Sequence, residues 1–138
     1  MNVLEGTRIL DLTQMLAGPY GSLVLADMGA EVIKIEEPEA GDRTRAMAPH
    51  FFENQSAYFI SVNRNKKSLT LNLKSEKGRE IFYELVKVSD IVFDNFRPAT
   101  LEKLKCDYET LSSINPKIIS CSLSPSGSPV MLIAPPSA

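Results

Sequence analysis

Residues 7–35, TRILDLTQMLAGPYGSLVLADMGAEVIKI, decide the fold of this chain. The apolar runs at 7–12 and 31–35 have the length and composition of short buried strands. Between them a loop with Gly18 and Pro19 leads into a mostly apolar segment that ends at Gly29, as a helix with a left-handed cap does. Strand, helix and strand in this order form a βαβ unit, which predicts a parallel sheet with a right-handed crossover.

Three further apolar runs, at 68–72, 91–95 and 118–122, predict additional strands. The clearest helix spans 75–88, where Ser75 is a good N-cap and Ile81, Phe82, Leu85 and Val88 are expected to form the buried stripe. Residues 39–57 show no clear period and predict an exposed loop. We therefore expect an α/β domain, Rossmann-like, with a mainly parallel sheet and flanking helices.

The composition excludes several classes of protein. The chain has 138 residues, 43% of them apolar, and a formal net charge of −2, which predicts a soluble globular domain without a nucleic-acid partner. No apolar run approaches the roughly 20 residues of a membrane span, and the start does not resemble a signal peptide, so we expect a cytoplasmic protein. Cys106, Cys121 and the only histidine, His50, have no metal-like spacing, which predicts no metal site.

The C-terminal residues differ in character from the rest. No charged residue follows Lys117, and four of the nine prolines lie in 125–138. We therefore divide the chain into a Rossmann-like domain at 1–123 and a Pro/Ser-rich tail at 124–138. The tail is expected to be flexible, with one apolar patch at 130–133.

Two features around the first βαβ unit could bind a ligand. The small-residue loop at 16–21 precedes a helix start, where free N–H groups favour phosphates, but it lacks G-x-G-x-x-G and the preferred interpretation is a packing turn. Glu36 follows the second strand, where dinucleotide folds place an acid that binds ribose, but without the glycine fingerprint the preferred interpretation is a solvated strand end.

Two further features carry cations. Asn95-Phe96-Arg97-Pro98 directly follows an apolar strand, and could hold an adenine or a pantetheine arm, or could simply form a turn. A set of basic residues could hold phosphates, or could be an ordinary charged surface: Arg64, Lys66, Lys67, Lys74, Arg97 and Lys103. No nucleophile–base pair can be assembled, so the residues alone indicate an α/β domain with an anionic, nucleotide-like ligand.

Taken together, the motifs from about Leu4 to Ser122 resemble the N-terminal part of class III CoA transferases. They are LEG at 4–6, ILDLT at 9–13, LAGP at 16–19, LADMGAEVIKIE at 25–36, GDRTR at 41–45, NRNKKS at 63–68 and NFRP at 95–98. The family includes formyl-CoA and carnitine-CoA transferases, and α-methylacyl-CoA racemase shares its fold. The resemblance implies acyl-CoA and carboxylate substrates, transfer through an aspartyl mixed anhydride, and an interlocked homodimer.

The resemblance also implies which residues contact CoA: Met15, Leu16, Ala17, Leu71, Lys74, Asn95, Phe96, Arg97 and Lys103. The chain departs from the family pattern at several of these places. Several transferases have Arg where this chain has Glu37 and Gln where it has Leu16, while Lys103 replaces Arg and Ala99 replaces Gly. These departures leave the acyl substrate open.

The largest departure follows Ser122, where the family continues with a glycine-rich turn and the segment that carries its catalytic Asp. SPSGSP at 124–129 replaces that turn, and no residue matches the Asp. We therefore expect an N-terminal part of a transferase that is inactive alone. The alternatives are a racemase relative, or a non-catalytic fragment that binds CoA or a partner protein.

Overall fold

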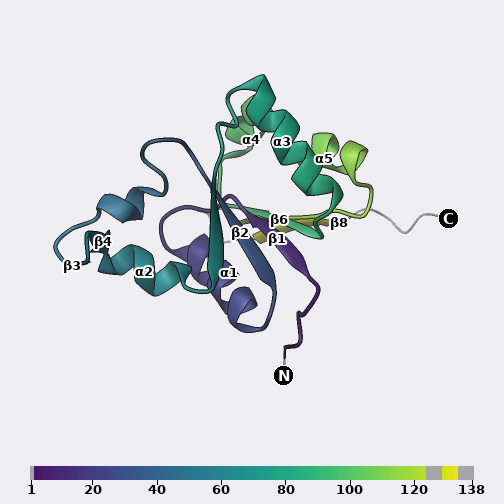
Figure 1. Cartoon of the computed structure of the whole chain (residues 1–138). Helices are drawn as coiled ribbons and strands as arrows, with labels where there is room; N and C mark the ends of the chain where they lie inside the picture. The colour runs from purple at the N-terminus through teal and green to yellow at the C-terminus, as the bar shows by residue number, and fades with distance from the viewer. Residues whose placement is uncertain (1, 124–128, 134–138) are drawn as a thin grey trace.

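The computed structural model describes residues 2–123 and 129–133, and its centre is a six-stranded sheet with helices on both faces (Figure 1). The strand order is β5-β2-β1-β6-β7-β8. The first five strands pair in parallel and β8 pairs antiparallel with β7. This confirms the expected α/β fold with a mainly parallel sheet. The strands are β1 Arg8–Asp11, β2 Glu31–Glu36, β5 Lys66–Thr70, β6 Ile91–Asp94, β7 Ile119–Leu123 and β8 Pro129–Ile133.

The helices divide between the two faces of the sheet (Figure 1). One face carries α1, Ala17–Asp27, with α2, Ala57–Asn63, beside it, and the other carries α3, Glu76–Lys87, with α5, Tyr108–Ile114, and the short α4, Pro98–Leu104. A 3-10 helix, η1 at Arg43–Ala46, and a small hairpin, β3 Phe51–Phe52 and β4 Gln55–Ser56, lie between β2 and α2. No helix in the described part of the chain is long and apolar enough to cross a membrane.

Alternate residues of the strands point to opposite faces of the sheet and belong to two apolar cores, one on each face. Leu10 and Val92 face α3 and pack with Phe82 and other fully buried side chains. Ile9, one residue along the same strand, belongs to a second cluster with Ala26 of α1. A strand at the centre of such a sheet is buried on both faces, which explains the unbroken apolar runs in the sequence.

The expected helix at 75–88 forms, but its buried face is different from the predicted one. Ser75 Oγ accepts a hydrogen bond from Gly78 N at 3.0 Å, as predicted for an N-cap. Phe82 and Val86 are fully buried, whereas Ile81 is 45% and Val88 60% exposed. The prediction for Ile81 and Val88 was wrong because apolar character alone does not determine which of two adjacent helical stripes faces the sheet.

Two other expectations need correction. The third strand lies at Lys66–Thr70, two residues before the predicted 68–72, because the buried side chain of Lys66 makes this polar start part of the sheet. The tail was expected to be flexible, but residues 129–133 form the edge strand β8 against β7. The outer edge of β7 would otherwise have unpaired N–H and C=O groups, and β8 pairs with them. Residues 124–128 and 134–138, the remainder of the predicted tail, lie outside the described residues.

Candidate functional site

The carboxyl ends of four parallel strands open into a groove of about 680 Å³. In open α/β sheets ligands bind at this edge, at the topological switch point where the strand order reverses on the two sides of the first strand. Here β1 is flanked by β2 on one side and by β6 on the other, so the groove lies at that point. It is lined by Leu12, Gln14, Met15, Ile35, Glu36, Glu37, Pro38, Glu39, Arg43, Leu71, Asn72, Leu73, Lys74, Asn95, Phe96, Thr100 and Leu104.

The groove combines a buried apolar floor with a polar rim. Leu12, Ile35 and Leu71 are at most 8% exposed and belong to the core beneath α3, and Phe96 packs against the same core. Glu37, Glu39, Arg43 and Lys74 are exposed at the rim. An extended ligand with apolar and charged parts fits such a surface.

Asn95 joins two loops of the groove. Its side-chain oxygen accepts a hydrogen bond from Gln14 N at 2.9 Å, and its amide nitrogen donates to Gln14 O at 2.7 Å. The backbone of Met15 follows directly, in the left-handed region at φ 73°, and turns into α1. The Asn95 amide therefore holds the loop after β1 in place, and its contact with CoA stays a prediction.

The buried carboxylate of Asp94, at the end of β6, binds the backbone of Phe96. The carboxylate is 1% exposed; it accepts from Phe96 N at 3.0 Å and from Ser122 Oγ at 2.5 Å. Burial without a neighbouring cation raises the pKa of Asp94, although both hydrogen bonds oppose the rise. These two bonds tie the loop that carries Phe96 to strand β7.

Glu36 is a buried structural residue, and the interpretation favoured from the sequence, a solvated strand end, was wrong. One carboxylate oxygen accepts from Asp42 N and Arg45 Nε, and the other accepts from Arg45 Nη2 at 2.6 Å and Ser68 Oγ at 2.5 Å. Burial acts to raise the pKa of Glu36, but these donors outweigh it and lower the pKa to about 2. The interaction closes the loop at 37–41, which forms one wall of the groove.

Two lysines are buried in ion pairs on the α1 side of the sheet. Lys34 Nζ lies 2.8 Å from Asp42 Oδ2 and donates to Thr13 O at 2.7 Å. Lys66 Nζ lies 3.1 Å from Asp11 Oδ2. Burial lowers the pKa of Lys66, although the neighbouring Asp11 acts to raise it. Lys34 thus ties β2 to the loops that follow β1 and β2, and Lys66 links the start of β5 to the end of β1 across β2.

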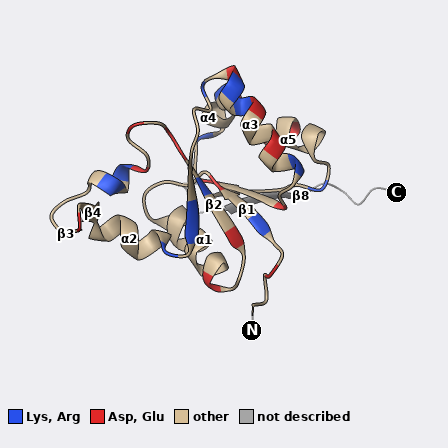
Figure 2. Cartoon of the chain, in the orientation of Figure 1, with Lys and Arg blue, Asp and Glu red and all other residues tan. Residues whose placement is uncertain are grey.

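Half of the predicted set of six basic residues forms ion pairs with acids of the chain itself. Besides Lys66, Arg64 pairs with Asp27 and Lys67 with Glu31, each at 2.5 Å. Only Lys74 of the predicted set lines the groove. Figure 2 shows acidic segments in the loop after β2 and basic ones in the adjoining η1, which contains Arg43.

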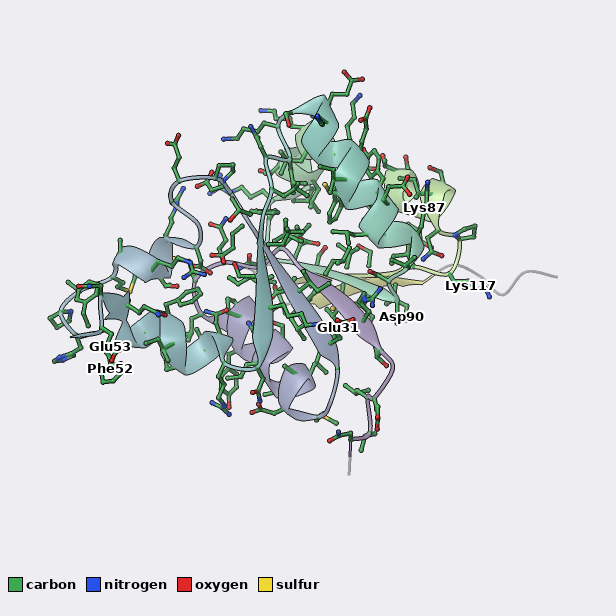
Figure 3. All side chains as sticks on the ribbon, in the orientation of Figure 1. Glu31, Phe52, Glu53, Lys87, Asp90 and Lys117 are labelled. Atoms are coloured by element: carbon green, nitrogen blue, oxygen red, sulfur yellow. The ribbon has the colours of Figure 1, made fainter. Side chains whose placement is uncertain are left out.

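The amino ends of the strands carry a separate charged cluster. Arg8 Nε lies 2.6 Å from Glu31 Oε2, and Arg8 N donates to Asp90 Oδ2 at 2.8 Å. Figure 3 shows Glu31 and Asp90 near each other, away from Phe52 in the β3–β4 hairpin. Because ligands of parallel sheets bind at the carboxyl ends, we assign this cluster to stability alone.

Five of the nine predicted CoA contacts line the groove: Met15, Leu71, Lys74, Asn95 and Phe96. The other four flank it without lining it. Leu16 and Ala17 begin α1, Arg97 precedes α4, and Lys103 lies in its last turn. Sequence reasoning did not name Gln14, Glu39, Arg43 or Thr100 as lining residues, although Arg43 is part of the quoted GDRTR motif.

The described residues contain no cluster of three or more His, Cys, Asp or Glu side chains that could hold a metal ion. Cys106 is buried and burial raises its pKa to about 12, so the thiol is not a reactive nucleophile. His50 is exposed and does not line the groove.

Comparison with known proteins identifies a family to which the chain is similar over most of its length. The family model described as CoA-transferase family III matches residues 4–129. The chain is 49% identical over 123 residues to a succinyl-CoA:glutarate CoA-transferase of Mus musculus, covering 89% of this chain and 28% of the relative. It is 47% identical over 133 residues to a succinyl-CoA:mesaconate CoA-transferase of Haloarcula marismortui, covering 94% and 33%.

Solved structures give the same result. A hypothetical protein of Mycobacterium tuberculosis superposes with a TM-score of 0.82 at 41% identity, covering 91% of this chain and 34% of that one. A CAIB/BAIF family protein of Brucella suis superposes with a TM-score of 0.80 at 43% identity, covering 86% and 32%. The chain thus spans about a third of the length of the relatives it matches.

Proposed function

This chain belongs to CoA-transferase family III, and from that premise we propose that its groove is the CoA-binding part of an acyl-CoA:carboxylate CoA transferase. The observation that carries the proposal is the groove itself. It lies at the carboxyl edge of the sheet, and five of the nine residues that the family resemblance assigns to CoA line it.

The groove has chemistry suited to the parts of CoA. The apolar floor around Leu12, Leu71 and Phe96 suits the pantetheine arm. Lys74 and Arg43 at the rim supply charge for the phosphates. The N-terminus of α1, which begins at Ala17 without a side-chain cap, adds N–H groups that favour an anion.

We propose small dicarboxylates as the CoA acceptors. The relatives named above act on glutarate and mesaconate, and another, 47% identical over 120 residues, is an acetyl-CoA:oxalate CoA-transferase of Acetobacter aceti. In the proposed reaction an aspartate carboxylate attacks the thioester carbonyl, the carbon–sulfur bond breaks and CoA thiolate leaves. The thiolate attacks the aspartyl carbonyl of the mixed anhydride, which releases the donor carboxylate and leaves an aspartyl-CoA thioester. The acceptor carboxylate attacks this thioester and releases the thiolate, and the thiolate then attacks the acceptor's carbonyl, which gives the new acyl-CoA and frees the aspartate.

The buried acids near the groove are already engaged within the chain, and we do not propose any of them as the attacking carboxylate. Glu36 is held by Arg45, and Asp94 by Ser122 and Phe96, while Asp11 is held by Lys66. Hydrogen bonds and ion pairs to a carboxylate stabilise its negative charge and make it a weaker nucleophile. We therefore propose that the 138-residue polypeptide binds CoA and does not by itself transfer it. The interlocked homodimer and the cytoplasmic location belong to the proposal as well.

Titration calorimetry with CoA tests the binding proposal. We expect measurable heat at millimolar CoA and affinity about five- to tenfold weaker for Lys74→Ala, because one charge-assisted phosphate contact contributes about 1 kcal/mol. Lys77→Ala is the matched control, since Lys77 is exposed on α3 and does not line the groove. No heat with the parent chain would overturn the proposal.

An exchange assay tests the absence of transfer. The purified 138-residue chain is incubated with succinyl-CoA and oxalate, glutarate or mesaconate, and the CoA esters are identified by mass spectrometry. We expect no new ester above a protein-free control. Turnover that follows the purified chain through successive columns would show that one of its own carboxylates is the nucleophile.

A further inference from the structure

A fully buried lysine lies between two walls of the groove. Lys34 of β2 is 1% exposed and is the largest fully buried side chain among the described residues. Its Nζ donates to Thr13 O at 2.7 Å and lies 2.8 Å from Asp42 Oδ2. Thr13 belongs to the loop after β1, and Asp42 belongs to the loop after β2. One ammonium group therefore contacts both loops.

Both of these loops line the groove. The loop after β1 contributes Met15, two residues beyond Thr13, and the loop after β2 contributes Arg43, directly after Asp42. Lys34 itself does not line the groove. It can therefore act on a ligand in the groove only through the positions of these two walls.

The contacts of Asp42 show that its pairing with Lys34 is specific. The Asp42 side chain is fully buried, its Oδ1 accepts from Thr44 N at 2.9 Å, and its Oδ2 contacts no donor among the described residues other than Lys34. Burial acts to raise the pKa of Asp42, but the Lys34 ammonium and the hydrogen bonds from Thr44 outweigh it and lower the pKa. The carboxylate is thus charged at neutral pH and depends on Lys34 as its counter-ion.

Stability alone does not explain this ion pair. The cost of desolvating two buried charges offsets most of their attraction, so apolar side chains of similar volume usually give a fold that is at least as stable. Val32, two residues before Lys34 on the same face of β2, is such an apolar side chain and is 1% exposed. What the ion pair adds is direction, because a charge-assisted hydrogen bond fixes its partners more narrowly than apolar packing does.

Resting on the proposed function, we propose that Lys34 is a positioning residue for CoA, which couples two walls of the groove through Thr13 O and Asp42. The nucleotide then meets walls that are already in place, so less ordering entropy is lost when it binds. Loss of both contacts should weaken CoA binding while the sheet beneath the groove stays folded.

A double variant that leaves no buried charge tests this. Lys34→Met alone would leave the Asp42 carboxylate buried without a cation, so it is combined with Asp42→Asn, whose amide oxygen can still accept from Thr44 N. In titration calorimetry we expect the affinity for CoA to fall about tenfold. Val32→Ala is the matched control, because it truncates a buried side chain of the same strand outside the groove. It should lower the stability but leave the affinity for CoA within about twofold of the parent value.

Hydrogen exchange followed by mass spectrometry separates positioning from a general loss of stability. In the double variant without ligand, we expect the peptides that cover 12–16 and 37–43 to exchange at least about fivefold faster than in the parent chain. The peptide that covers α3 should exchange as in the parent. Equal acceleration in all three peptides would show that Lys34 only stabilises the fold.

The outcomes separate this inference from the proposed function. If the parent chain gives no heat with CoA, the proposed function is wrong and the inference falls with it. If the parent chain binds CoA and the double variant binds it equally well, only the inference is wrong. Should circular dichroism show the double variant to be unfolded, Asp42→Asn alone decides, because it keeps the bond from Lys34 to Thr13 O and removes the charge at the other wall. We expect it to weaken CoA binding about three- to fivefold, and unchanged affinity would overturn the inference.

Discussion

Replacing Glu36 by Gln removes the charge that closes the loop beside the groove. Burial and four donors set the pKa of Glu36 at about 2 in the folded chain, against 4.5 for a free glutamate. That difference corresponds to about 3 kcal/mol of folding free energy at neutral pH. Because the Arg45 side chain is 36% exposed, solvent screening reduces the expected loss for Glu36→Gln to about 2 kcal/mol.

The pH dependence is the sharper part of this prediction. A folded pKa below the unfolded one means that the stabilisation is fully present above pH 4.5 and is lost as the pH falls through the interval from 4.5 to about 2. At pH 3 roughly four-tenths of it remains. The free-energy difference between the parent chain and Glu36→Gln should therefore be less than half its value at pH 7.

Urea unfolding followed by circular dichroism at pH 7 and pH 3 measures both values. Glu39→Gln is the control, because Glu39 is exposed on the same loop and forms no ion pair within the described residues. It should change the free energy of unfolding by less than about 0.5 kcal/mol at both values of pH. A loss for Glu36→Gln that is equally large at pH 3 and pH 7 would refute the reasoning, since it would show that packing and not charge is lost.

Three other predictions concern the hydrogen bonds of Asn95, the packing of Phe82 and the reactivity of the two cysteines. Asn95→Ala removes both hydrogen bonds to Gln14, so it should lower the free energy of unfolding in urea by about 1–2 kcal/mol. It should also weaken the affinity for CoA about tenfold in calorimetry, and unchanged affinity would show that the loop needs no such support. Phe82→Ala should cost about 3–5 kcal/mol because the side chain is fully buried, and a loss under 1 kcal/mol would contradict the assigned core. At pH 8 a thiol reagent should modify Cys121 before Cys106, whose pKa burial raises to about 12, and equal rates would contradict this order.

The sequence alone was sufficient to predict the fold class and most of the elements. The apolar runs at 7–12 and 31–35, separated by a helical segment, have only one common solution, the βαβ unit. Ser75 as an N-cap, and Asp107, which accepts from Thr110 N at 2.9 Å, are signals that act within one turn of the chain. Signals of this kind are local, which is why the sequence carries them in readable form.

The candidate site was only partly predictable, because its residues come together from four strands. Leu71, Lys74 and Phe96 follow from the rule that ligands bind at the carboxyl ends of parallel strands, with the family resemblance selecting among the residues there. Arg43 reaches the groove through a loop without any regular period. Nothing in the spacing of that loop shows where its side chains point.

The pairing of charges was decided by the tertiary structure alone. Lys34 and Lys66 look like exposed residues in the sequence, yet both side chains are 2% exposed and face Asp42 and Asp11. A lysine is buried only if an acid from a distant segment meets it, and that meeting depends on strand order and register. For the same reason Glu36 and Glu37, adjacent and chemically identical, differ in role: Arg45 and Ser68 reach only the first, so only the second remains free at the groove.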